Sequence, residues 1–324
     1  MQLLTAREVP LGGLRALMVR RTLPHRNRSF IGAWCFVDHY GPDRIAADGS
    51  GGMDVAPHPH TGLQTVSWLF EGEIEHRDSA GFHAFVRPQE VNLMTAGHGI
   101  AHSEVSTPAT RVLHGVQLWV ALPESARDGE RTFEHYAAPG SPLPDDAGVA
   151  YVFLGHLHGV AESPVATHTP LLGAQLDLAP GARLTLALDP TYEHGILLDA
   201  GDVAITQAVP AGEAPTGGGG RTSHHELSFG DMACFDPGRN HLTLTSSGGA
   251  RLILLGGPPF EEEIVMWWNF VGRSHEDIVA AREQWEAGSD RYGAVPGYAG
   301  PRPRIPAPAL PGARLRPRGR RGVR

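Results

Sequence analysis

The chain has 324 residues, enough for two domains of ordinary size, and its 41 glycines and 27 prolines favour short strands joined by turns over helical bundles. Its formal net charge is −8, and residues 301–324 carry eight arginines and no acidic residue, so the rest of the chain is more acidic still, which argues against sequence-independent binding of nucleic acid. There is no stretch of about 18 apolar residues that would span a membrane and no signal-peptide pattern, and the two distant cysteines predict free thiols, so we expect a cytoplasmic protein with no membrane partner.

The first half of the chain reads as a series of strands. Runs rich in β-branched and aromatic residues end at turn residues such as Glu71-Gly72-Glu73. From 116 to 121, apolar side chains alternate with Gln117 and Trp119, and this period of two is typical of a strand. The strands expected in this half are residues 65–70, 82–86, 91–94 and 116–121. Strands at this spacing, broken by Gly and Pro, predict an antiparallel sandwich or barrel.

The second half repeats this pattern after a connection at residues 123–150, and strands are expected at 184–188, 195–199, 203–206 and 252–255. Four consecutive glycines within 210–221 indicate a surface loop, because the GK[ST] ending of a phosphate loop is absent. One helix is expected after Ser274, which fits an N-cap with an acidic residue three positions on. Its apolar face would carry Ile278, Ala281 and Trp285.

Two short motifs place metal-capable side chains two residues apart: His58-Pro59-His60 and His102-Ser103-Glu104. Residues i and i+2 of a strand point to the same face, so each motif can aim two ligands at one point. If the two strands face each other, three imidazoles and one carboxylate surround one ion. This ligand set suits a divalent transition metal that keeps open coordination positions.

Four segments resemble signatures of the pirin family, in the family's order and over nearly the whole chain. Gly52, five residues and then His58-Pro59-His60 resemble the start of the first cupin motif, and residues 95–104 (TAGHGIAHSE) resemble the pirin form of the second. Residues 36–42 (FVDHYGP) and 267–273 (WWNFVGR) are similar to the N-terminal signature and to a segment near the C-terminus of pirins.

The resemblance implies an all-β bicupin: two antiparallel, jelly-roll-like β-barrels with a short C-terminal helix. We therefore expect an N-terminal cupin barrel with the metal site at residues 1–135. A C-terminal cupin barrel without metal, plus the helix, would occupy 136–290. The Pro- and Arg-rich tail at 291–324 is expected to be disordered, as its composition suggests.

The resemblance also implies the metal ligands, because the positions of the pirin ligands are occupied by His58, His60, His102 and Glu104. One divalent ion is expected, with iron(II) first and nickel, manganese, cobalt, copper or zinc as alternatives. Gln64 stands where many cupins and many pirins carry Glu. Because the pirin carboxylate comes from the second motif, this change should leave the ligands intact and affect only the groups around them.

Pirins resemble quercetin 2,3-dioxygenases, which implies a dioxygenase that opens the heterocycle of quercetin-type flavonols, or of a related enolisable substrate, with loss of carbon monoxide. Glu104 would be the catalytic base that takes the proton of the flavonol 3-hydroxyl. The alternative is a metal- or redox-sensing regulator that binds protein partners. An enzyme should have a cavity above the metal wide enough for a three-ring ligand, whereas a sensor need not.

Other histidines are expected to be structural or exposed, since nothing in the sequence pairs them with further ligands. They include His39, His76, His83, His98 and His114. His156 and His158 form a pair without a matching His-x-Glu motif and are interpreted as coincidental. Trp267 and Trp268 are expected to pack in a core or between domains and not to form a ligand platform.

Overall fold

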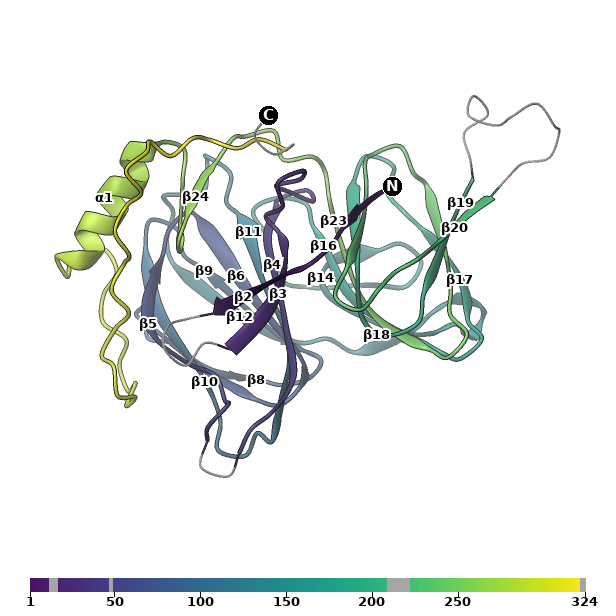
Figure 1. Ribbon diagram of the computed structural model, residues 1–324, viewed down its shortest axis with the longest axis horizontal. Coiled ribbons are helices and arrows are strands. Elements are labelled where there is room, and N and C mark those ends of the chain that lie inside the picture. Colours follow the sequence, from purple (N-terminus) through teal and green to yellow (C-terminus); the bar gives the residue numbers. More distant parts are fainter. Residues whose placement is uncertain (12–16, 47–48, 209–221, 321–324) are drawn as a thin grey trace. The chain divides into compact units, whose positions relative to one another are not determined.

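The computed structural model describes residues 1–11, 17–46, 49–208 and 222–320, and within these ranges it consists of antiparallel strands and a single α-helix (Figure 1). The chain divides into two compact units. The first unit comprises residues 7–137 and 260–324, and the second comprises 1–6 and 138–259. The helix of the described part is too short to cross a membrane. The glycine-rich loop expected at 210–221 lies outside the described residues.

The first unit is built from two antiparallel sheets and a small ribbon. The larger sheet contains, in spatial order, β12 (Thr132–Ala137), β9 (Glu90–Thr95), β6 (Leu63–Glu71), β11 (Val112–Ala121), β4 (Trp34–Arg44), β3 (Leu17–Leu23) and β2 (Arg7–Leu11). The smaller sheet contains β5 (Asp54–His60), β10 (Ile100–Ser106), β7 (Ile74–Asp78) and β8 (His83–Val86). The ribbon pairs β24 (Val265–Trp267) with β25 (Phe270–Gly272).

The second unit also has two antiparallel sheets. The larger contains, in order, β1 (Gln2–Leu4), β21 (Met232–Phe235), β18 (Glu193–Gly201), β23 (Ala250–Gly257), β16 (Leu172–Leu178), β14 (Gly148–Leu157) and β13 (Gly140–Pro142), with β15 (Ala161–Glu162) beside β14. The smaller contains β17 (Arg183–Ala187), β22 (His241–Thr245), β19 (Ala204–Ala208) and β20 (Thr222–Glu226). A 3-10 turn, η1 (Pro144–Asp146), precedes β14.

The all-β fold class predicted from the sequence is confirmed, although the sheets of each unit stay open and do not close into continuous barrels. All eight expected strands are present, with ends that shift by a few residues. In β17, buried Leu184 and Leu186 alternate with exposed neighbours and join the leucine-rich core of the second unit. Both cysteines, Cys35 and Cys234, are buried thiols, as predicted.

Strand β11 shows how the fold creates an internal cavity. Its even-numbered apolar residues Val116 and Leu118 are fully buried, as expected for the core side of a half-buried strand. Gln117 and Trp119 on the other face are also only about 6% exposed, because they line a cavity between the sheets of the first unit. Alternate residues of β11 therefore point to the core on one face and to the cavity, where a ligand could bind, on the other.

The helix α1 (His275–Glu286) begins as its sequence predicts. Ser274 accepts a hydrogen bond from the Asp277 backbone N–H at 3.1 Å, and the Asp277 carboxylate accepts one from the Ser274 backbone N–H at 3.3 Å, which completes a capping box. The predicted apolar face, with Ile278, Ala281 and Trp285, is buried.

Residues 291–320, the described part of the tail, include side chains that pack against α1, although the composition of the tail predicts disorder. Arg304 donates to the backbone carbonyl of Trp285 at 2.5 Å, and the Trp285 indole N–H donates to the carbonyl of Ile305 at 2.9 Å. The backbone N–H of Ile305 donates to the carbonyl of Pro57 in β5 at 2.8 Å. Figure 1 shows this segment, in yellow, running alongside α1. Hydrogen bonds to the end of α1 and to β5 therefore hold this segment in place, although few of its own side chains are buried.

The units differ from the sequence-based regions mainly in where the helix belongs. The units divide near residue 137, residues 1–6 cluster with the second unit, and residues 260–290 cluster with the first unit. The ion pair between Arg127 and Asp277, at 3.2 Å, is one contact that ties the start of α1 to the first unit. Because α1 follows the second half in the sequence, the sequence alone did not predict that it packs with the first unit.

Candidate metal centre

The two histidine motifs lie on neighbouring strands of the smaller sheet of the first unit. In the antiparallel register of β5 and β10, His102 is directly opposite His58, and Ile100 is opposite His60. Between His102 and Glu104 the register shifts, so Glu104 lies opposite Val55. Such an irregularity changes the direction of a side chain relative to an ideal ladder.

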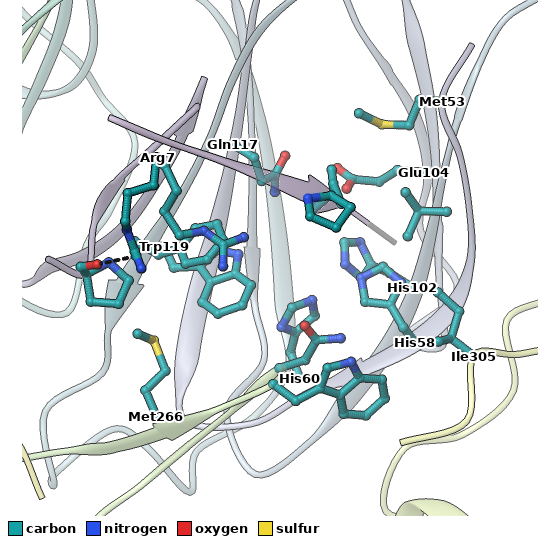
Figure 2. Close-up of a pocket in the computed structure, with 18 of the residues that line it drawn as sticks. Arg7, Met53, His58, His60, His102, Glu104, Gln117, Trp119, Met266 and Ile305 are labelled. Carbon is teal, nitrogen blue, oxygen red and sulfur yellow. Dashed lines mark hydrogen bonds between the residues drawn. The ribbon is translucent and has the colours of Figure 1, made fainter. Parts of the chain in front are cut away.

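The three predicted imidazoles converge (Figure 2). Their ring centroids are 5.0 Å apart for His58 and His60, 4.3 Å for His58 and His102, and 4.9 Å for His60 and His102. One nitrogen from each ring lies within 4.8 Å of those of the other two. All three side chains are buried.

Burial keeps these imidazoles neutral. It lowers the pKa of His58 to about 4, and it lowers the pKa values of His60 and His102 well below 6.5, with a further contribution from neighbouring histidines. Neutral imidazole is the form that binds a metal. At neutral pH the three rings therefore present lone pairs and do not repel one another.

The unpartnered nitrogens of the site fit a metal. Among the described residues, His60 Nδ1 and His102 Nε2 are buried without a hydrogen-bond partner. His58 Nδ1 donates to the carbonyl oxygen of Ala56 at 3.0 Å, which leaves the lone pair on Nε2. Buried polar atoms normally have partners, and a bound ion would supply one for these nitrogens.

Glu104 belongs to the same cavity but to a second group of ligand atoms. Its carboxylate lies within 4.8 Å of His102 and His76, and this group does not include His58 or His60. Burial raises the pKa of Glu104, and His76 and the Ser67 hydroxyl, which donates to the carboxylate at 2.8 Å, partly offset the increase. The structure therefore brings together three of the four predicted ligands tightly, with the fourth beside His102.

His76 is a site residue that the sequence did not reveal. It lies on β7 directly opposite Glu104, and its Nε2 is 3.1 Å from the buried Asp78 carboxylate. Its Nδ1 is 3.4 Å from His102 Nδ1. If Asp78 fixes the proton of His76 on Nε2, His76 Nδ1 accepts from His102 Nδ1–H, and His102 Nε2 is left to bind a metal. The spacing of His76 and Asp78, two residues apart on a strand, was the available signal.

A cavity of about 660 Å³ lies above the histidines. Phe36 and Trp119 form part of its wall, with ring centroids 4.0 Å apart and planes 12° apart. Trp268 and the tail residue Ile305 also line it, so Trp268 does more than pack in a core. Gln64 does not line the cavity; its amide donates to Thr95 at 2.9 Å.

Comparison with known proteins identifies relatives along the whole chain. The family profile described as Pirin matches residues 16–120, and the one described as Pirin C-terminal cupin domain matches 173–291. A Pseudomonas aeruginosa protein named "Putative quercetin 2,3-dioxygenase" is 42% identical over 311 residues, which cover 96% of this chain and 91% of that protein. A Caulobacter vibrioides "Pirin-like protein" is 36% identical, over 87% of this chain and 92% of that one.

Among solved structures, the crystal structure of quercetin 2,3-dioxygenase from Acinetobacter baumannii resembles the chain with a TM-score of 0.85 and 38% sequence identity. The match covers 98% of this chain and 97% of that one. The sequence-based family resemblance is therefore confirmed.

The buried histidines predict that the metal-free protein loses stability in mild acid. Between the folded pKa of His58, about 4, and its ordinary value of 6.5, the unfolded chain binds more protons than the folded chain. This contribution to stability is complete above the upper value, falls as the pH falls through the window, and does not change further below about 4. Thermal unfolding of chelator-treated protein across this range measures it.

Replacing His58 by Leu should make the melting temperature fall less steeply with acid than in the wild type. The matched control is His98→Leu, because the side chain of His98 is 60% exposed. That variant should follow the wild-type curve. Equal slopes for wild type and His58→Leu would contradict the assignment of the effect to the buried site.

Proposed function

Because this chain belongs to the pirin family of bicupin proteins, we propose that it is a metal-dependent dioxygenase that opens the heterocycle of quercetin-type flavonols or of a related enolisable substrate. The observation that carries the proposal is the convergence of three neutral imidazoles at the wall of a cavity of about 660 Å³. A cavity of this volume is within the usual range for small-molecule sites. The names of the relatives support the same chemistry.

His58, His60 and His102 would hold the ion, with Glu104 as the fourth ligand. Three nitrogens and one oxygen suit iron(II), and nickel, manganese, cobalt, copper or zinc also accept this set. When bound, the ion would supply Lewis acidity toward a substrate hydroxyl and the redox chemistry with dioxygen. The remaining tasks fall to the protein: binding, orientation, exclusion of water and transfer of a proton.

Glu104 is the proposed general base. Burial raises its pKa, which makes its carboxylate a better proton acceptor than an exposed one. The Ser67 hydroxyl lies 2.8 Å from Glu104 Oε1 and 3.0 Å from Gln117 Oε1, so these side chains hold the carboxylate at the edge of the cavity. From there Glu104 would accept the proton of the flavonol 3-hydroxyl.

His76 and Asp78 are proposed as positioning residues. The hydrogen-bonded series from Asp78 through His76 to His102 fixes the orientation of the His102 ring. His76 also lies near Glu104 and favours its ionised form. One pair of residues thus orients a ligand and limits the pKa rise of the base.

The cavity favours the enzyme over the alternative of a metal- or redox-sensing regulator. A sensor needs no enclosed space for a ligand, whereas this cavity has a flat aromatic wall of Phe36 and Trp119 that suits a planar ring system. Apolar side chains such as Met53 and Ile305 also line it and would help to exclude water from the reaction.

The direct test is dioxygen uptake by the iron(II)-loaded protein with quercetin, with carbon monoxide measured in the gas phase. We expect uptake and carbon monoxide release in equal amounts. The double variant His58→Ala, His60→Ala should show neither, because two of the three converging imidazoles are gone. Stoichiometric metal with no uptake would remove the flavonol dioxygenase from consideration.

Glu104→Gln tests the base. The amide keeps the size of the side chain and an oxygen for the ion but has no appreciable basicity. We expect turnover of quercetin to fall by at least about a hundredfold while much of the metal stays bound. Steady-state rates and metal content by mass spectrometry give the two readouts. Unchanged turnover in the metal-loaded variant would refute the base role.

A further inference from the structure

One end of the cavity is strongly cationic. Five basic side chains line the cavity: Arg7, Arg21, His25, Arg26 and Arg318. Among the described residues that line the cavity, Glu104 is the only acidic one. The chain as a whole has 35 acidic residues against 27 basic ones, so this end has the opposite charge to the rest of the molecule. A local excess of one charge in a concave site concentrates ligands of the other sign.

Three of these arginines form no ion pair with a carboxylate among the described residues. Arg7, Arg26 and Arg318 are exposed, and within the described part of the chain none has an ion pair. Arg7 donates to the carbonyl oxygen of Pro24 at 3.0 Å, which holds its guanidinium in place. Burial and the charges of Arg26 and Arg7 lower the pKa of His25, as expected where positive charges crowd together.

Arg21 is different, because a buried partner fixes it. Its guanidinium makes two hydrogen bonds to the Asp38 carboxylate, at 2.6 and 2.7 Å, and lies 4.3 Å above the centroid of the Phe36 ring. Asp38 is fully buried. Arg21 therefore contributes orientation and little net charge, while the three unpaired arginines supply the positive field.

An aromatic wall connects the histidines to this cationic end. The His60 ring meets Trp119 edge to face at 5.2 Å, Trp119 stacks on Phe36 at 4.0 Å, and Phe36 carries the guanidinium of Arg21. Figure 2 shows Arg7 on the opposite side of the cavity from Glu104 and His102, with Trp119 on the side of Arg7. A planar ligand along this wall would have one end at the histidines and the other at the arginines.

We propose that the substrate is an aromatic acid: a flavonol-like ring system that carries a carboxylate, sulfate or phosphate group opposite its metal-binding hydroxyl. The arginines would bind this anionic group, the Phe36–Trp119 wall would bind the rings, and the hydroxyl would lie beside Glu104. The inference rests on the proposed function, since it specifies the substrate class of the same cavity. Exposed arginines are common on protein surfaces, but these share one cavity and one aromatic wall with the candidate metal ligands.

The test compares two matched probes, quercetin and quercetin carrying one sulfonate on its catechol ring, by isothermal titration calorimetry with chelator-treated protein. We expect the sulfonate to bind about tenfold more tightly than quercetin. In the triple variant Arg7→Gln, Arg26→Gln, Arg318→Gln, the two dissociation constants should agree within about twofold, because the sulfonate has lost its arginines.

The control variant is Arg183→Gln, which removes the same charge from an exposed position on β17 of the second unit. It should keep the full preference for the sulfonate. Equal binding of the two probes by the wild type, or a preference that survives in the triple variant, would overturn the inference.

A second measurement does not depend on how the variants fold. In the wild type, raising sodium chloride from about 50 mM to about 500 mM should weaken binding of the sulfonate and leave quercetin nearly unaffected, because salt screens exposed charges. Equal salt dependence of the two probes would contradict an arginine-bound anion.

The outcomes also separate this inference from the proposed function. Preference for the sulfonate without turnover of either probe in the iron-loaded enzyme would keep the anion site and remove the dioxygenase. Turnover of quercetin without any preference for the sulfonate would support the dioxygenase and remove the anion site.

Discussion

The pairing of β5 with β10 is the constraint on which the candidate site depends. Antiparallel register sets His102 opposite His58, and the two-residue period of the strand places His60 on the same face as His58. A slip of one residue would turn a whole ligand set to the other face of the sheet. The pairing of β7 with β10 adds His76 opposite Glu104, so three adjacent strands carry the candidate ligands and the His76 and Asp78 side chains beside them.

Burial sets the protonation states of the side chains in this arrangement. The same desolvation that keeps the imidazoles neutral raises the pKa of Glu104 and makes it a stronger proton acceptor, and His76 and the Ser67 hydroxyl limit that rise. The cavity then joins two contrasting ends. One end presents the three candidate ligand histidines, and the other presents basic side chains such as Arg7.

Local patterns in the sequence predicted much of the fold and the three converging histidines. Strand periodicity, the Ser274 cap and the HPH motif depend on residues close together in the chain, and the structure reproduces each of them. What could not be predicted depends on long-range contacts. In the sequence His76 is an isolated histidine, and only the pairing of β7 with β10 shows that it lies opposite Glu104. The tail has the composition of a disordered segment, and only the folded structure shows the hydrogen bond between Ile305 and Pro57. Likewise, Arg7 and Arg318 are far apart in the sequence, and only the folded structure shows that both line one cavity.

The measurement that tests the central claim most directly is X-ray absorption spectroscopy of the iron(II)-loaded protein, because the multiple scattering of imidazole rings reports how many histidines bind the ion. We predict three imidazoles in the wild type and two in His102→Ala. The His98→Ala variant, which changes an exposed histidine, should keep three. A wild-type spectrum with fewer than three imidazoles, or one unchanged in His102→Ala, would contradict the account.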